Sequence, residues 1–178
     1  NMKQFAARAN GNAIAYSDPN ESAIAPALAE AMAESGGFIG TAWNKPDDVG
    51  PLDYTPNWVI HTSPDNINNG YMISEVLFEA MGGEGQILVL DGMLGNTAAT
   101  HRGAGLDKAL SENSGIEVAA RDTANWDTKQ ALNLVETWLN QYPDVKGIWC
   151  ANDNMATGAI QALDQVGLKG NVDRKSDV

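Results

Sequence analysis

The sequence is poor in cysteine and histidine, two residues that build many catalytic and metal centres. Its 178 residues include one cysteine and two histidines. A single cysteine cannot form an internal disulfide bond, and neither His61 nor His101 has a partner at the spacing that metal sites use. Cys150 lies in the apolar segment 147–151 and has no histidine in a recognisable motif, so we interpret it as a small buried hydrophobic residue. The sequence therefore predicts no catalytic site, no metal site and no cofactor.

Positive charge and long hydrophobic runs are also scarce. Lys and Arg number 11 against 23 Asp and Glu, which gives a net charge of −12. This balance argues against a nucleic-acid partner, because contacts of Lys and Arg with phosphate supply most of such affinity. No apolar stretch approaches the ~20 residues of a membrane span. The first residues lack the order of an export signal, so either such a signal was removed or the chain is an interior segment.

What the sequence does have is a regular alternation of strand-like and helix-like patterns. Short apolar runs alternate with segments in which apolar residues recur at helical spacing. The expected strands are 13–17, 38–43, 58–62, 86–90, 116–120 and 145–151, and the expected helices are 2–10, 22–35, 66–81, 96–112, 127–139 and 154–166. This order is typical of an α/β protein with parallel sheets and right-handed crossovers.

Polar and aromatic side chains follow several of the expected strands. In open parallel sheets, ligands bind beyond the carboxyl ends of the strands. The side chains placed there include Trp43, Asn44 and Lys45, then Asp91 and Arg102, then Arg121, Asp122, Asn125 and Trp126, and finally Asn152 and Asp153. Aromatic rings pack on the apolar C–H face of a sugar, whereas Arg and Asn offer fixed hydrogen-bonding groups to neighbouring hydroxyls. The set therefore suits a small polyhydroxylated ligand.

The same residues also have purely structural interpretations. Asn152 is a typical helix N-cap, Arg102 is compatible with a solvated helix face, and Trp126 with a place in the core. Trp43 is harder to assign to packing, because it begins a polar loop rich in proline. The residues alone leave these alternatives open.

Three segments resemble the ribose-type, type I periplasmic sugar-binding proteins of ABC importers. They are GNTAATHRGAGL at 95–106, TANWDTKQALNLVETWL at 123–139 and GIWCANDNMATGAIQALDQVGL at 147–168. The N-terminal part is similar more loosely, through AIAYSDPNESAIAPALAEAM at 13–32 and GTAWNKPDD at 40–48. The similarity covers roughly residues 13–170.

The resemblance implies two Rossmann-like three-layer α/β/α lobes with parallel sheets, both incomplete in this chain, which close on a ligand by hinge motion. Residues 1–64 are expected to be part of the N-terminal lobe, 65–172 most of the C-terminal lobe, and 173–178 an unassigned tail. The first strand–helix units of the N-terminal lobe and everything after Val172 are expected to lie outside the chain.

The resemblance also implies ligand-binding roles for five residues. Arg102 corresponds to the arginine that reaches ring and hydroxyl oxygens, Trp126 to the aromatic residue that stacks on the sugar, and Asn152 to the amide that bonds hydroxyls. Trp43 and Asn44 stand where ribose binders carry Asp–Arg. This departure argues against ribose and leaves the sugar unidentified.

The implied function is that of a periplasmic solute-binding protein, which captures a small sugar or polyol and delivers it to the membrane permease of an ABC importer. Such a protein is a binder and not an enzyme. We expect the full-length protein to be a monomer, and this chain to self-associate through an unpaired edge strand at 13–17 or 38–43. The alternatives are the ligand-sensing domain of a lac-repressor-type transcription regulator and a Rossmann-like small-molecule enzyme.

Overall fold

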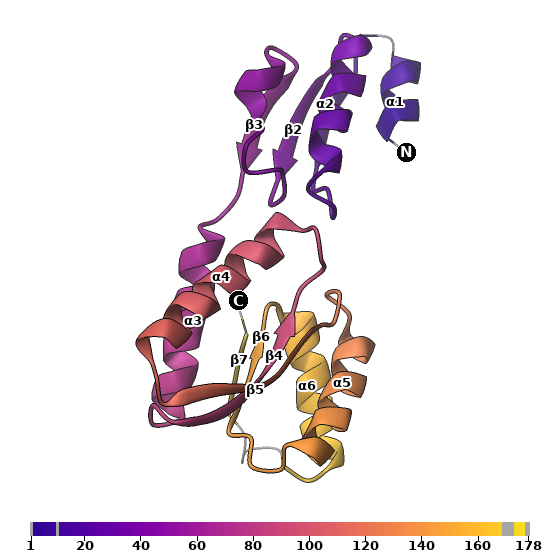
Figure 1. Cartoon of the computed structure of the whole chain (residues 1–178). Helices are drawn as coiled ribbons and strands as arrows, with labels where there is room; N and C mark the ends of the chain where they lie inside the picture. Colours follow the sequence, from indigo (N-terminus) through magenta and orange to yellow (C-terminus); the bar gives the residue numbers. More distant parts are fainter. Residues whose placement is uncertain (1, 10, 169–172, 177–178) are drawn as a thin grey trace. The chain divides into compact units, whose positions relative to one another are not determined.

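The computed structural model describes residues 2–9, 11–168 and 173–176 (Figure 1). The elements are α1 (Met2–Ala9), β1 (Ile14–Ser17), α2 (Ile24–Glu34), β2 (Phe38–Ala42), the 3-10 helix η1 (Pro51–Tyr54), β3 (Trp58–Thr62), α3 (Asn66–Ala80), β4 (Gly85–Asp91), α4 (Thr97–Glu112), β5 (Ile116–Thr123), α5 (Thr128–Gln141), β6 (Gly147–Cys150), α6 (Asp153–Gln165) and β7 (Asp173–Ser176). The described strands pair in parallel, which confirms the predicted α/β class.

The chain divides into two compact units. Unit 1 comprises residues 1–64 together with 95–98, and unit 2 comprises residues 65–94 and 99–178. Each has its own parallel sheet, with the strand order β1-β2-β3 in unit 1 and β5-β4-β6-β7 in unit 2. Each also has its own cluster of buried apolar side chains, so each has a separate core.

In unit 1, α1 and α2 cover one face of the sheet. Ala29 and Met32 of α2 are fully buried there, in the same cluster as Ile39 and Trp58 of the sheet. The sequence predicted a helix over 22–35, but α2 starts at Ile24, and its N-cap, Ala23, makes no side-chain hydrogen bond to the helix. The helix is held by burial of its alanine-rich face and not by a cap.

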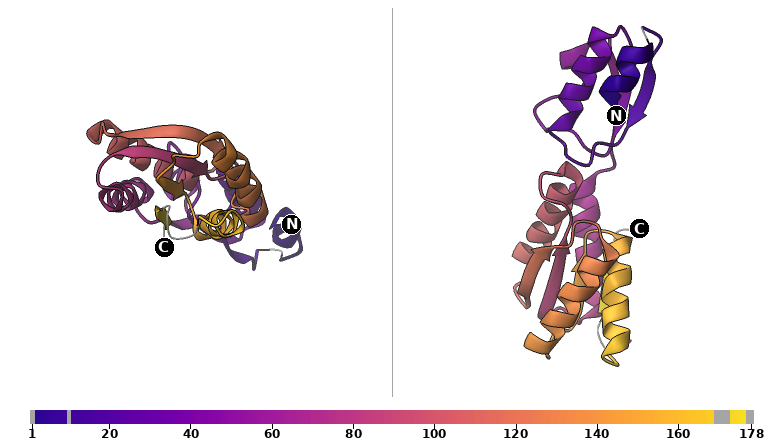
Figure 2. Two further views of the ribbon diagram at one scale, coloured as in Figure 1. Left: turned by 90° about the horizontal axis from the view of Figure 1, so that it is seen from below. Right: turned by 90° about the vertical axis from the view of Figure 1, so that its right-hand side faces the viewer.

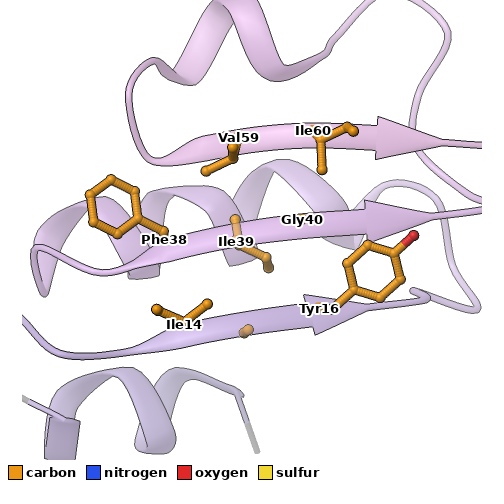
Figure 3. A pocket seen from close by; sticks show the side chains of 8 residues that line it. Ile14, Tyr16, Phe38, Ile39, Gly40, Val59 and Ile60 are labelled. Carbon is orange, nitrogen blue, oxygen red and sulfur yellow. The ribbon is translucent and has the colours of Figure 1, made fainter.

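The other face of this sheet is apolar and exposed (Figure 3). Ile14 is 78% exposed, Tyr16 63%, Phe38 40%, Val59 61% and Ile60 49%. Their side chains line an open hollow of about 410 Å³. Parallel sheets normally have both faces covered, so this face is an unusual surface for the chain to expose.

In unit 2, helices cover both faces of the sheet, with α3 and α4 on one side and α5 and α6 on the other (Figures 1 and 2). The central strand β4 is buried on both faces, and Ile87, Leu88, Val89 and Leu90 are each 0% exposed. A continuous apolar run is the pattern that such a strand requires. This part of the prediction is confirmed.

Three strands of unit 2 differ from the sequence prediction by more than one residue. β6 spans only Gly147–Cys150, where 145–151 was predicted. β5 continues to Thr123, so Arg121 and Asp122 lie within the strand and not beyond its end. β5 is an edge strand of this sheet, and edge strands accommodate exposed charges. Residues 173–176, left unassigned by the sequence, form β7 beside β6; residues 177 and 178 of the expected tail lie outside the described residues.

Candidate functional site

Three of the predicted site residues belong to the carboxyl edge of the unit 2 sheet. β4 ends at Asp91, β5 at Thr123 and β6 at Cys150, and parallel strands end at one common edge. Arg102 lies on α4, Trp126 in the loop between β5 and α5, and Asn152 at the N-terminus of α6. The fold of unit 2 therefore brings a guanidinium, an indole and an amide to this edge.

Arg102 is held from two sides. It is only 9% exposed, its Nε donates a hydrogen bond to Oδ1 of Asn66 at 3.1 Å, and its Nη1 donates to the carbonyl oxygen of Ala151 at 2.7 Å. The interpretation of Arg102 as a solvated helix residue is therefore wrong. A buried guanidinium, which stays charged, presents its donors in a fixed planar fork and binds oxygen atoms with defined geometry.

Asn66, the first residue of α3, is a part of this arrangement that the sequence did not single out. Its side chain is 2% exposed, and its carbonyl oxygen orients Arg102. The sequence signal was weak, because a polar residue directly after the capping Asp65 is ordinary at the start of a helix. Only the packing of α3 against α4 reveals its role.

Trp126 has an unusual backbone conformation. Its φ is 63° and that of Asn125 is 52°, both in the left-handed region that bulky residues rarely adopt. Side-chain bonds hold the loop: Thr123 Oγ1 donates to the carbonyl oxygen of Gly92 at 2.5 Å, and Asn125 Nδ2 donates to Gln130 Oε1 at 2.9 Å. Such conformations concentrate at ligand sites, where the surrounding structure enforces them.

The indole of Trp126 lies near the buried guanidinium. The Cζ atom of Arg102 is 5.8 Å from the centroid of the Trp126 ring, within the range of a cation–π contact. Trp126 is partly buried and packs against the unit 2 core. The core interpretation and the ligand interpretation are therefore compatible: one part of the ring packs inward while another part reaches solvent.

Asn152 caps α6. Its Oδ1 accepts a hydrogen bond from the backbone N–H of Met155 at 3.0 Å, which confirms the N-cap interpretation. Within the described part of the chain, its Nδ2 makes no hydrogen bond. The cap therefore occupies the acceptor half of the amide and leaves the donor half for another group.

In unit 1, Trp43 and Asn44 follow β2 directly. Trp43 is 41% exposed and has a φ of 60°. Asn44 is only 4% exposed, and its amide is engaged on both sides: Nδ2 donates to Asp18 Oδ1 at 2.9 Å, and Oδ1 accepts from the backbone N–H of Ala98 at 3.1 Å. Asn44 thus stabilises the segment that exposes Trp43.

Arg121 of β5 forms ion pairs with two carboxylates of unit 2. Arg121 donates to Asp91 and to Asp107, each at 2.5 Å.

No three His, Cys, Asp or Glu side chains of the described residues gather as a metal site. Cys150 is fully buried, and that burial raises the pKa of its thiol, as expected of an inert packing residue. None of the described helices is both long and apolar enough to span a membrane.

Comparison with known protein families gives one match over nearly the whole chain. The family described as the periplasmic binding protein domain matches residues 2–173. Among curated proteins, a xylitol-binding protein of Mycolicibacterium smegmatis is 35% identical over 117 residues, which are 65% of this chain and 34% of that protein.

Two solved structures resemble the chain closely. A twin-arginine translocation pathway signal protein from Burkholderia phytofirmans has a TM-score of 0.94 and 38% identity, over 97% of this chain and 54% of that one. An ABC transporter periplasmic solute binding protein from Actinobacillus succinogenes, with bound D-allose, has a TM-score of 0.84 and 30% identity, over 97% of this chain and 59% of that one. The chain thus spans about a third of the curated relative and little more than half of the solved chains.

Proposed function

The chain belongs to the periplasmic binding protein family, as its motif segments predict, and we propose that the full-length protein captures an uncharged sugar or polyol in the periplasm for an ABC importer. The observation that carries this proposal is the buried Arg102, held by Asn66 and Ala151 beside the indole of Trp126. The relatives support it: one is named as xylitol-binding, and another was solved with D-allose.

We assign a different task to each group of unit 2. The Trp126 ring offers a flat apolar surface for the C–H face of the ligand, while Arg102 and Nδ2 of Asn152 donate hydrogen bonds to its hydroxyl oxygens. An uncharged ligand fits, because the nearby Asp91 carboxylate is already bonded to Arg121. Binding and release by these groups require no bond to be made or broken, so the assigned role is that of a binder and not an enzyme.

We assign the contribution of the N-terminal lobe to Trp43 and Asn44. The lobes are taken as residues 1–64 and 65–172, with the crossing between them after Pro64. Trp43 supplies a second aromatic surface, whereas the buried amide of Asn44 acts by holding the loop that carries it. The full-length protein closes on its ligand by hinge motion and then delivers it to the permease.

A panel of sugars and polyols tests this proposal on the full-length protein. Thermal shift against xylitol, D-allose, D-ribose and myo-inositol should identify a ligand, and calorimetry should then give its affinity for wild type, Arg102→Ala and Trp126→Ala. Loss of a charged donor costs about 1.5–3 kcal/mol, which is at least a tenfold loss of affinity.

The exposed Arg8 of α1 provides the matched control, and Arg8→Ala should bind like wild type. The proposal is contradicted if no member of the panel binds. It is equally contradicted if both site variants retain wild-type affinity.

A further inference from the structure

Gly92 follows β4 directly and lies beneath the indole of Trp126. It is buried, and a Cβ atom built on it would lie less than 3.0 Å from Cη2, Cζ2 and Cζ3 of that indole. Real Cβ atoms essentially never make such contacts, because ordinary van der Waals contact begins near 3.4 Å. The outer edge of the indole therefore rests on the backbone of Gly92, in space that only glycine leaves open.

The backbone conformation of Gly92 does not itself require glycine. Its φ lies outside the left-handed region, in contrast to Gly95 with a φ of 77°. An alanine at position 92 thus meets no backbone strain of that kind. The requirement for glycine at this position comes from the indole.

The loop that carries Trp126 is seated on the same short segment. The backbone N–H of Ala124 donates to the carbonyl oxygen of Asp91 at 3.0 Å, and Thr123 Oγ1 donates to that of Gly92 at 2.5 Å. With the loop held by these bonds, an added Cβ must displace the ring by about 1 Å, since ordinary contact begins near 3.4 Å. The Arg102 guanidinium, 5.8 Å from the ring centroid, is itself fixed and cannot follow that shift.

We propose that Gly92 is a positioning residue for ligand binding, which sets the height of the Trp126 indole relative to Arg102. This inference rests on the proposed function and deepens it. Stacking and hydrogen bonding act on one ligand at the same time, so they need a fixed spacing between ring and guanidinium. A gap of about 0.5–1 Å already forfeits roughly a quarter to a half of a van der Waals contact, so a ring displaced by that much loses part of its stacking on a ligand that Arg102 holds in place.

A double-mutant cycle in the full-length protein tests the proposal. Phenylalanine at position 126 is shorter and lacks the three atoms that a Cβ at position 92 would meet. Gly92→Ala should therefore weaken binding of the tightest panel ligand at least tenfold when Trp126 is present, and less than threefold in the Trp126→Phe protein. Gly50→Ala is the matched control, because Gly50 is extended and its added Cβ would meet only Lys45 Cε at 3.9 Å.

Thermal unfolding without sugar provides an independent readout. Gly92→Ala should lower the Tm more when Trp126 is present than in the Trp126→Phe protein. This difference reports the contact between the two residues whether or not a sugar binds. Equal losses of affinity from Gly92→Ala in the two backgrounds would overturn the proposal. If Arg102→Ala and Trp126→Ala both leave affinity unchanged, the proposed function fails instead. If Gly92→Ala alone does not fold, recovery of folding and binding in the double variant supports the proposal, and failure to recover overturns it.

Discussion

Asn152 offers the sharpest separation of a structural role from a binding role. Its Oδ1 caps α6 by accepting from the N–H of Met155, while Nδ2 is the group assigned to the ligand. Serine retains the cap through its hydroxyl but has no group in place of Nδ2. Alanine has neither the cap acceptor nor the donor. Asn, Asp and Ser are similarly good N-caps, and replacement by Ala costs about 0.5–2 kcal/mol.

The two substitutions should therefore give different results. Asn152→Ala should lower the free energy of unfolding by ~1 kcal/mol, which corresponds to a Tm about 2–4 °C lower for a domain of 150–250 residues. Asn152→Ser should change the free energy of unfolding by only about a few tenths of a kcal/mol. Both should lose one neutral hydrogen bond to the ligand, about 0.5–1.5 kcal/mol or roughly 2- to 12-fold in affinity.

Denaturant unfolding and calorimetry of the full-length protein measure these two quantities separately. If Asn152→Ser binds the ligand as tightly as wild type, Asn152 is a cap and nothing more. If Asn152→Ser is as unstable as Asn152→Ala, the assignment of the cap to Oδ1 is refuted.

Two further outcomes are expected. Burial, and then the charge of Lys45, lower the pKa of His61 below its usual 6.5. As pH falls through about 6.5, the unfolded state therefore binds more protons than the folded state, and the Tm of the wild type should decline. The Tm of His61→Asn should decline less. Parallel profiles of Tm against pH for the two proteins would contradict this. The 178-residue chain alone should bind sugar weakly, because it spans little more than half of the solved relatives and so carries only part of a two-lobed site. It should also elute as more than a monomer, because Ile14 and Val59 expose an apolar sheet face. Ile14→Thr/Val59→Thr should restore the monomer, and an unchanged elution volume would show that another surface is responsible.

Much of the fold was predictable because buried positions are apolar, and their spacing along the sequence follows the period of the strand or helix. β4 is a continuous apolar run because both of its faces are covered, and β3 spans Trp58–Thr62, the limits that the sequence predicted. The extension of β5 was not predictable in this way. Arg121 interrupts the apolar pattern, and its place in the strand depends on ion pairs with Asp91 and Asp107, which come from β4 and α4.

The candidate site likewise has features that the sequence predicts and features that depend on packing. Arg102, Trp126 and Asn152 could be named from their positions after strands and from the motif segments. The burial of Arg102 against Asn66 could not, because it depends on how α3 packs on α4. The contact of Trp126 with Gly92 depends on a left-handed backbone at residue 126, which no local preference of tryptophan predicts.

The most direct test of the account is a crystal structure of the full-length protein with the tightest ligand of the panel. We expect the sugar or polyol to lie with its C–H face on the Trp126 indole, with hydroxyl oxygens within hydrogen-bonding distance of Arg102 and of Nδ2 of Asn152. A ligand bound elsewhere, or bound at this edge without contact to Arg102 and Trp126, would contradict the account.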